Sequence, residues 1–515
     1  MRNVLKRCLS VFAVVVAATT FSLPAFAEQV MNTDVVIIGA GTSGLAAGVQ
    51  AIQNGNKVIL LEKQAKVGGT GNFCEGLFAA ESKIQKRIGI DVSKDFAFDT
   101  IMEYSHYKAN GALVSCFVDK SAETIDWLDE LGVKIEYVGV GGFGGPLTWH
   151  VIAPGPDYPD KNPHDYHCAR MINVFNKYIL DHGGEILLQT PGTGLIKKDG
   201  KVVGAFAENK DGENIRINAK AVIIATGGFA NNKEMMNKYS PYPDLIPVGN
   251  MGKDGDGIRM AWDAGAAEEG VDVMQMYRPG LKGFHPADQM IALAVQPYFW
   301  VNPRGERYTD ESSVQLWPYA GNALVRIGGT AYSIYDDATR KKAVEEGIEM
   351  PLGEWVIQGT KLTNWEKSFY KELKRDRGNV FKANSIKELA KMLDMDPAVL
   401  QSSVDKMNSW AQTREDGEFK KDSKFLRAVA TPPFYATKLT PRHLGTLGGV
   451  RINEKTEAVN EHDEAVPGLY VVGTDAGGMY GDSYDLLLGG GTAGFAVNSG
   501  RIAADSASEY IGAAQ

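Results

Sequence analysis

The chain has 515 residues, of which 44% are apolar and 23% are charged. This length exceeds one ordinary domain, so two or three domains are expected, and the composition excludes a disordered or fibrous chain. The formal net charge of −9 argues against nucleic acid and other polyanions as partners.

The first 27 residues have the pattern of a signal peptide that is cleaved on export. Basic residues at Arg2 and Lys6 precede an apolar run over residues 11–20, and Ala25-Phe26-Ala27 matches a small-x-small cleavage site. The apolar run is too short to span a bilayer comfortably. We therefore expect a periplasmic or secreted protein that uses the general secretory route and has no membrane span once the signal is removed.

Cysteine is scarce in the remainder of the chain, where Cys74, Cys116 and Cys168 are left. No two of them form a C-x-x-C pair, and the chain has no C-x-x-C-H motif for covalent haem. We expect no metal site. One disulfide is possible, but three thiols cannot all pair.

Residues 34–62 carry the motif on which the interpretation of the whole chain depends. An apolar strand, Val35 to Ile38, leads into the turn Gly39-Ala40-Gly41-Thr42-Ser43-Gly44, a small-residue helix and a second strand that ends at Glu62. Gly39 permits the tight turn, Gly41 lets N–H groups approach a pyrophosphate, and Gly44 lets the helix sit close to the strand. Glu62 would accept hydrogen bonds from a ribose. An ordinary glycine turn is the alternative, but this complete context favours a bound dinucleotide.

The following segments are expected to mix helices with glycine-rich loops. The polar loop Gly68 to Asn72 could approach a flavin, because glycine leaves no side chain in the way. Residues 82–135 are interpreted as helices. Residues 139–163, with Trp149 and His150, are interpreted as a long loop that acts as a lid or a tether.

The middle of the chain returns to regular structure. A helix is expected over residues 168–181 and a strand over 185–189, followed by antiparallel strands at 194–198, 202–209 and 214–218. Residues 221–228 repeat the strand that enters a glycine turn, and Asp256 is expected in the first turn of a helix.

Aromatic and proline residues become frequent from about residue 276, and a third glycine-rich strand end follows near residue 473. We interpret residues 28–275 and 433–515 as two parts of one nucleotide-binding domain and residues 276–432 as an inserted domain that covers the substrate. Within the insertion, Ser385-x-x-Glu388 predicts a helix start, and Pro397 predicts another. The predicted fold is α/β, with a doubly wound Rossmann-like domain and an α+β cap.

The three glycine turns, in this order and with these intervals, resemble the fumarate reductase and 3-ketosteroid dehydrogenase superfamily of flavoproteins. The resemblance covers nearly all of the chain after the signal peptide and implies FAD as the cofactor, with a mobile capping domain that closes over the flavin. The residues that we expect to bind FAD are Gly39, Gly41, Thr42, Ser43, Gly44, Glu62, Lys63, Gly69, Thr70, Asn72, Phe206, Thr226, Gly228, Asp256, Asp475, Gly490 and Thr492.

Four positions depart from the pattern of the fumarate reductases. Gln315 stands where that pattern has its proton-donating arginine, and Gly445 stands where it has a histidine. The arginine before the last Leu-Gly-Gly is absent, and Arg278 before Pro279 replaces a further histidine. Without those groups the carboxylates of fumarate would be poorly paired in a closed site. We therefore expect fumarate to be a poor substrate.

Tyrosine is the best proton donor that remains, as in the ketosteroid-type relatives. Tyr484 and Tyr480 lie in the segment expected to face the flavin, although either one could be a core aromatic residue. Arg278 could hold a carboxylate or polarise a carbonyl, or form a surface ion pair. His443 is a further candidate, although a histidine there could equally be structural.

These residues favour an exported FAD-dependent reductase. It would transfer a hydride from reduced flavin to the activated C=C bond of an unsaturated acid or enone that is aromatic or bulky. The alternatives are a ketosteroid-like dehydrogenase that runs the reverse desaturation and a non-catalytic flavin electron carrier. A separate electron donor, such as a cytochrome, a flavoprotein or a quinol-linked protein, is the expected partner.

Overall fold

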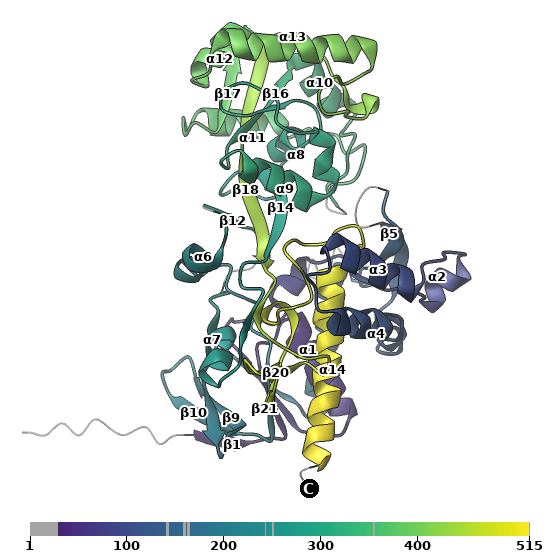
Figure 1. The fold of residues 1–515 in the computed structure, drawn as a ribbon, viewed down its shortest axis with the longest axis vertical. Helices are drawn as coiled ribbons and strands as arrows, with labels where there is room; N and C mark the ends of the chain where they lie inside the picture. The colour runs from purple at the N-terminus through teal and green to yellow at the C-terminus, as the bar shows by residue number, and fades with distance from the viewer. Residues whose placement is uncertain are drawn as a thin grey trace, which may run out of the picture.

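The structure is a computed structural model that describes residues 29–140, 144–157, 161, 165–242, 244–249, 252–353 and 356–513. The expected signal peptide, residues 1–27, lies outside these ranges. Two lobes are stacked along the long axis of the molecule (Figure 1). Strands β14 (Met274–Gly280) and β18 (Phe434–Thr446) run between the lobes and pair with each other.

The lower lobe is built on a sheet of six strands in the order β20-β21-β11-β2-β3-β7. The strands from β21 to β7 are parallel, and β20 is antiparallel to its neighbour. Their bounds are β2 Val35–Ile38, β3 Val58–Glu62, β7 Glu185–Leu188, β11 Ala221–Ile224, β20 Glu457–Val459 and β21 Ala465–Val471. The predicted α/β class is confirmed, and the strands expected at residues 35–38, 185–189 and 221–224 form within a residue of those bounds.

Both faces of this sheet are covered, which explains why its strands are apolar at every position. Val35 and Ile37 pack against one layer, which contains the helices α1 (Thr42–Gln53), α5 (Cys168–Asp181) and α14 (Gly491–Ala513). Val36 and Ile38 pack toward the other layer, an antiparallel meander flanked by β1 (Gln29–Asn32). The meander strands are β8 Gly192–Lys198, β9 Lys201–Glu208 and β10 Asn214–Asn218, close to their predicted bounds.

A small sheet in the lower lobe corrects the expectation of a long loop around residue 150. Strands β4 (Gly76–Phe78), β6 (Leu147–Ile152) and β5 (Ile135–Val140) pair in that order, so Trp149 and His150 belong to a strand. The glycine- and proline-rich sequence around them suggested a loop, but the β-branched and aromatic residues of β6 pair with β4. The expected helices lie between β4 and β5 in the chain and are α2 Lys83–Arg87, α3 Lys94–Tyr104 and α4 Gly111–Glu130.

The upper lobe is a mixed sheet covered by helices. Its longest strand, β18, pairs with β16 (Ala331–Asp336) and β17 (Val380–Ala383), and β15 (Trp300–Val301) extends the sheet beyond β16. Its helices are α8 Gln289–Ala294, α9 Trp317–Arg326, α10 Asp337–Glu345, α11 Trp365–Leu373, α12 Ile386–Met392 and α13 Pro397–Thr413. The two helix starts predicted in this region are confirmed: Ser385 accepts a hydrogen bond from the Glu388 N–H at 3.1 Å, and α13 begins at Pro397.

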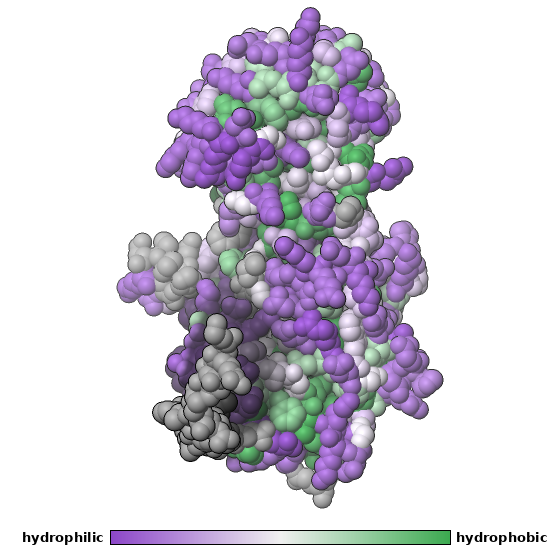
Figure 2. All heavy atoms as spheres, turned by 90° about the vertical axis from the view of Figure 1, so that its left-hand side faces the viewer, coloured by the Kyte–Doolittle hydropathy of each residue, from purple (hydrophilic) through white to green (hydrophobic). Residues whose placement is uncertain are grey.

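The division of the chain at residues 276 and 432 stays a prediction. Residue 276 lies inside β14, and residue 432 lies two residues before β18, so both positions fall where the two lobes are linked. Figure 2 shows that the molecule narrows between the lobes and that hydrophilic residues cover much of the visible face. Among the described residues, no helix combines the length and the hydrophobicity needed to cross a membrane.

Candidate active site

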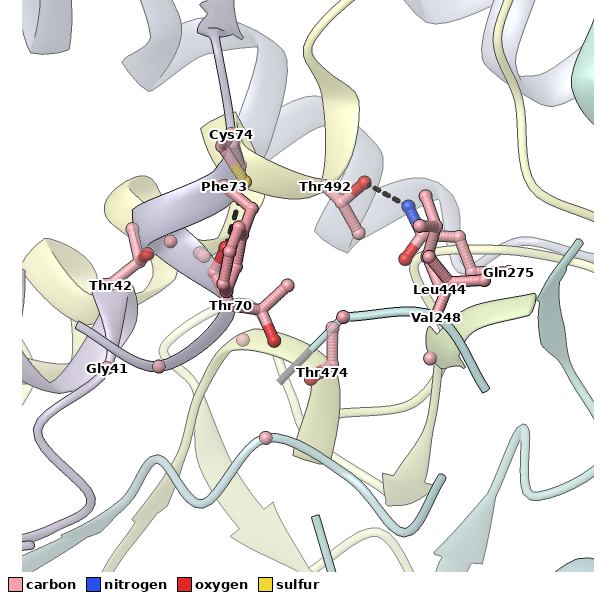
Figure 3. A pocket seen from close by; sticks show the side chains of 18 of the residues that line it. Gly41, Thr42, Thr70, Phe73, Cys74, Val248, Gln275, Leu444, Thr474 and Thr492 are labelled. Carbon is pink, nitrogen blue, oxygen red and sulfur yellow. Dashed lines mark hydrogen bonds between the residues drawn. The ribbon is translucent and has the colours of Figure 1, made fainter. Parts of the chain in front are cut away.

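A cavity of about 930 Å³ lies where the lower lobe meets the upper lobe. Ligand pockets usually measure about 300–1,000 Å³, so this cavity has room for a large cofactor or for a cofactor with a small substrate. The glycine turns of the lower lobe form part of its wall, and Val314, Gln315, Trp317 and Met350 contribute from the upper lobe. Figure 3 shows side chains that converge on the cavity from several elements.

The first glycine turn has the geometry that a dinucleotide requires. Gly39 has a φ of +107°, and a methyl group on it would lie 2.2 Å from the Ala225 carbonyl oxygen. A methyl group on Gly44 would lie 1.9 Å from the Gly39 carbonyl oxygen, so only glycine lets α1 approach the strand this closely. Gly41 lines the cavity and has no atom within 4 Å of its missing side chain. The start of α1 is therefore open to an anionic group.

Glu62 is fixed by the backbone at the end of β3. Its carboxylate accepts hydrogen bonds from the Ala40 N–H at 3.0 Å and the Gln64 N–H at 2.8 Å, and the residue lines the cavity. Burial raises the pKa of the Glu62 carboxyl, although both N–H donors act in the opposite direction. Nearby, Lys63 pairs with Asp256 at 2.7 Å, and Asp256 lies in the first turn of α7 (Asp256–Asp263) as expected.

Replacing Glu62 with Ala should weaken the retention of FAD. The variant removes the acceptor expected to bind the ribose, and a hydrogen bond to a charged group contributes about 1.5–3 kcal/mol. The dissociation constant for FAD, measured by flavin fluorescence after dilution, should rise by about 10- to 100-fold. A Glu62→Ala protein that keeps FAD as tightly as the parent would show that this carboxylate does not bind the ribose.

Most of the residues expected to bind FAD line the cavity. They are Gly39, Gly41, Thr42, Ser43, Glu62, Lys63, Gly69, Thr70, Thr226, Asp256, Gly490 and Thr492. The Thr70 hydroxyl is buried and has no hydrogen-bond partner among the described residues. Figure 3 shows Thr42, Thr70, Thr474 and Thr492 around the same space. Open glycine backbone, an unsatisfied hydroxyl and a fixed carboxylate fit the phosphate, polyol and ribose groups of FAD.

Five residues of the expected FAD set do not line the cavity. Gly44 acts through helix packing, and Asn72 braces its own loop by donating to the Val67 carbonyl at 3.0 Å. Phe206 lies in the meander under the guanidinium of Arg216, 5.5 Å from its ring centre. Gly228 and Asp475 act together, because the Asp475 carboxylate accepts the Gly228 N–H at 2.7 Å and the Gly227 N–H at 3.1 Å. Asp475 therefore ties the end of β21 to the glycine turn after β11.

Arg278 lies at the end of β14 with its guanidinium at the cavity wall. Only 2% of the residue is exposed, and Nη2 donates a single hydrogen bond, to the Leu352 carbonyl at 3.3 Å. Nε and Nη1 have no partner among the described residues. The guanidinium lies 4.6 Å from the ring centre of Tyr277 and 5.2 Å from that of Trp317. It is not a surface ion pair, and it can donate to an oxygen of a bound ligand.

The two candidate tyrosines differ in where they lie. Tyr484 lines the cavity, whereas Tyr480 is not part of the lining and packs edge-on against Tyr484, with ring centres 5.8 Å apart. Burial raises the pKa of Tyr484 to about 12, so its hydroxyl is protonated at neutral pH. Gln315, at the position of the missing arginine, also lines the cavity. Tyr484 is thus the better placed of the two to donate a proton.

The histidine candidates are held inside the protein. His443 is fully buried, does not line the cavity and has its Nδ1 3.3 Å from the Gly445 carbonyl oxygen. Burial lowers its pKa to about 4, so it is neutral at pH 7. His150 contacts Ser82 Oγ at 2.7 Å and the Thr148 carbonyl at 2.9 Å, and burial lowers its pKa to about 4 as well. The partners of His150 make it a structural residue of β6.

The cavity lining includes residues that were absent from the sequence-based set, among them Gln275 and Lys253. Gln275 donates to the Thr492 hydroxyl at 2.8 Å, the hydrogen bond drawn between these two side chains in Figure 3. Lys253 reaches the cavity wall, where its Nζ donates to the Leu444 carbonyl at 2.8 Å. One feature of the sequence could have identified Lys253. It lies in the glycine-rich run Gly252 to Gly257, just before the expected acid Asp256.

Comparison with known proteins agrees with this geometry. The profile of the FAD binding domain family matches residues 34–490. The chain belongs to this family. It is an FAD-dependent oxidoreductase, and FAD is its cofactor.

Relatives of this FAD-binding protein extend over almost its whole length. A vinyl phenol reductase of Lactiplantibacillus plantarum is 34% identical over 489 residues, which are 93% of this chain and 96% of that protein. The open conformation of a flavocytochrome c3 fumarate reductase is 25% identical and superposes with a TM-score of 0.71 over 93% of this chain and 79% of that one.

A third relative shows the same fold at lower identity. The 3-ketosteroid Δ1-dehydrogenase of Sterolibacterium denitrificans is 19% identical, with a TM-score of 0.74 over 93% of this chain and 99% of that one. The expected membership of the fumarate reductase and ketosteroid dehydrogenase superfamily is confirmed, and so is the predicted fold class.

Proposed function

We propose that this protein reduces the C=C bond of a vinyl phenol or a closely related unsaturated aromatic compound. The observation that carries the proposal is the cavity wall around Tyr484. A buried, protonated tyrosine hydroxyl lies there together with the aromatic residues Tyr277, Trp149 and Trp317, and a glutamine replaces the arginine expected in a fumarate reductase. The similarity to a vinyl phenol reductase over nearly the full length supports it.

The residues of the cavity divide the reaction between them. Bound FAD supplies the hydride when it is reduced. Tyr484 holds the proton that the other carbon of the double bond receives, and Arg278 supplies positive charge to the same cavity. An opposite charge stabilises the tyrosinate that forms after the proton has left. The aromatic walls exclude water and provide flat surfaces for a ring.

A substrate screen tests this proposal. Purified protein, supplied with electrons from dithionite-reduced viologen, should oxidise the viologen with 4-vinylphenol and related styrenes or aromatic enoates. Release of 4-ethylphenol, identified by chromatography, would establish the reaction. Desaturation of a ketosteroid in a parallel assay with an oxidised dye as electron acceptor, with no reduction of any styrene, enone or enoate, would instead favour the reverse chemistry. No turnover with any of these compounds would favour an electron carrier.

Fumarate should be reduced at least about 100-fold more slowly than the best aromatic substrate. Gln315 and Gly445 supply no charge where the family pattern has an arginine and a histidine, and a carboxylate without its partner in a closed site costs about 3–5 kcal/mol. The same viologen assay measures both rates. A fumarate rate equal to the best aromatic rate would show that these two positions do not decide the substrate.

Export and a separate electron donor complete the proposal. The basic start, short apolar run and Ala25-Phe26-Ala27 site support cleavage after residue 27. Mass spectrometry of the periplasmic protein should then find Glu28 as its first residue. A cytochrome, flavoprotein or quinol-linked protein is proposed as the donor, and the chain's net charge of −9 favours a donor with a basic face.

A further inference from the structure

Lys253, in the segment before α7, brings a positive charge to the wall of the cavity. A methyl group on Gly227 would lie 4.0 Å from the Cγ of Lys253. The Lys253 Nζ reaches the Leu444 carbonyl at 2.8 Å. The residue lines the cavity and is partly exposed to it. Among the described residues, Nζ has this one hydrogen bond and no ion pair. An ammonium has three N–H donors, so it can donate two more hydrogen bonds.

The space in front of Lys253 is created by a glycine. A methyl group on Gly445 would lie 3.5 Å from Lys253 Nζ and 3.9 Å from Gln275 Oε1, both ordinary contact distances, and φ of Gly445 is not in the left-handed region. The backbone therefore does not demand glycine at this position. Its absent side chain instead leaves the ammonium open to the cavity, beside a glutamine that also hydrogen-bonds to Thr492.

The chemistry of Lys253 differs from that of Arg278, another cation of the cavity wall. An arginine stays charged, whereas a buried lysine can exchange a proton. Burial lowers the pKa of Lys253 to about 8, with Cys74 acting in the opposite direction. An unperturbed phenol has a pKa of about 10. In its neutral amine form, such a lysine can receive the proton of a phenol. The ammonium that results holds the phenolate, and this charge pairing offsets the higher pKa of the phenol.

We propose that Lys253 determines specificity for phenols by binding the phenolic oxygen of the substrate and stabilising it as a phenolate. This inference rests on the proposed function and deepens it. A vinyl phenol needs such a group, because its C=C bond is not conjugated to an electron-withdrawing group. Electron density from the phenolate oxygen lets the terminal carbon take a proton, and the quinone methide that forms then accepts the hydride.

The proposed step balances in protons and electrons. The phenolic proton passes to the neutral amine of Lys253, and an electron pair moves from the oxygen through the ring. The terminal vinyl carbon takes a proton from Tyr484, which leaves a quinone methide. A hydride then bonds to the carbon attached to the ring, the electron pair returns to the oxygen, and the oxygen takes its proton back from Lys253. The sum is vinyl phenol plus hydride plus proton giving ethyl phenol, and Tyr484 regains its proton from solvent.

A pair of non-reacting ligands tests the role of Lys253 without turnover. 4-Ethylphenol and its methyl ether 4-ethylanisole have the same ring and side chain, but only the first has a phenolic proton. Their dissociation constants for the FAD-loaded protein are measured by perturbation of the flavin absorbance. Lys253→Met should raise the dissociation constant of 4-ethylphenol by about 10- to 100-fold, as expected for a lost charge-assisted hydrogen bond. The dissociation constant of 4-ethylanisole should change by less than about threefold. Lys282→Met, at an exposed lysine of the upper lobe, is the matched control and should change neither constant.

Other outcomes would overturn the proposal. Equal weakening of both ligands, or unchanged binding of both, would show that Lys253 does not recognise the phenolic oxygen. A shifted flavin reduction potential with an unchanged preference for the phenol would show that the charge serves the cofactor. If Arg278→Met lost the preference for 4-ethylphenol over 4-ethylanisole and Lys253→Met kept it, the arginine would be the residue that binds the phenolic oxygen. The viologen assay of the parent protein with 4-vinylphenol decides separately whether the proposed function holds.

Discussion

Replacing Tyr484 with Phe should lower turnover of the aromatic substrate by about 10²- to 10⁴-fold, the usual contribution of a positioned general acid. Tyr484 lines the cavity, and burial raises its pKa to about 12, so the hydroxyl carries a proton throughout the neutral range. Phe keeps the ring, which is 4% exposed and packs against Tyr480. The variant should therefore fold and retain FAD. Steady-state assays with 4-vinylphenol measure the loss.

Two comparisons test whether the defect of Tyr484→Phe lies in proton transfer to the substrate. The rate at which reduced viologen bleaches the flavin absorbance should not change in Tyr484→Phe, because that step does not use the hydroxyl. Tyr480→Phe is the matched control, since the residue lies next to Tyr484 but does not line the cavity. It should keep turnover close to that of the parent. Parental turnover in both variants would mean that neither tyrosine supplies the proton.

Local sequence signals were sufficient to predict the strands and the glycine turns of the lower lobe. Residues 35–38 and 221–224 are apolar at every position, and they form parallel neighbours in the centre of the sheet, with Val35 opposite Ala221. Gly44 was expected to allow close packing of α1, and the structure leaves no room for a methyl group there. Such features depend on neighbours a few residues away or on burial of both faces. The strand β6 was missed because the glycine- and proline-rich sequence around it suggested a loop, and because one of its two partners, β4, lies far earlier in the chain.

Placement of side chains in the site could not be predicted in the same way. Asp475 was expected to contact FAD, which stays a prediction. What the sequence did not indicate is that its carboxylate binds the turn at residues 226–228, about 250 positions earlier in the chain. Lys253 reaches the cavity because Leu444 offers a carbonyl there, 191 positions later. A motif locates the backbone of a strand end or a turn. Which way its side chains point depends on contacts between distant segments, which no local pattern contains.

Replacing Glu311 with Gln should destabilise the upper lobe by about 3–5 kcal/mol, the usual cost of removing one partner of a buried ion pair. Glu311 accepts two hydrogen bonds from Arg307, at 2.9 Å and 2.7 Å, and its side chain has 0% exposure. Lys421 also pairs with Glu311, at 2.9 Å, and Arg307 continues to Asp416 at 2.9 Å. Gln keeps the shape but leaves two buried cations with one carboxylate fewer. Urea unfolding followed by tryptophan fluorescence measures the change.

A second glutamate in the same segment provides the matched control. Glu306 pairs with Arg304 at 2.8 Å, but their side chains are 48% and 78% exposed. Glu306→Gln should therefore change the free energy of unfolding by less than about 1 kcal/mol. If both substitutions destabilised the protein equally, burial of the Glu311 pair would not be the source of its stability.

The contribution of Glu311 should also depend on pH with a definite sign. Burial alone raises the pKa of this carboxyl, but Lys421 and Arg307 together more than offset that effect and hold the pKa below its ordinary value. The stabilisation is therefore complete above the unfolded-state pKa of about 4.3 and is lost as the pH falls through the lower folded-state value. The unfolding free energies of the parent and of Glu311→Gln should differ fully at pH 7 and converge below about pH 4. A difference that stays constant from pH 7 to pH 3 would mean that the charge of Glu311 is not what stabilises this lobe.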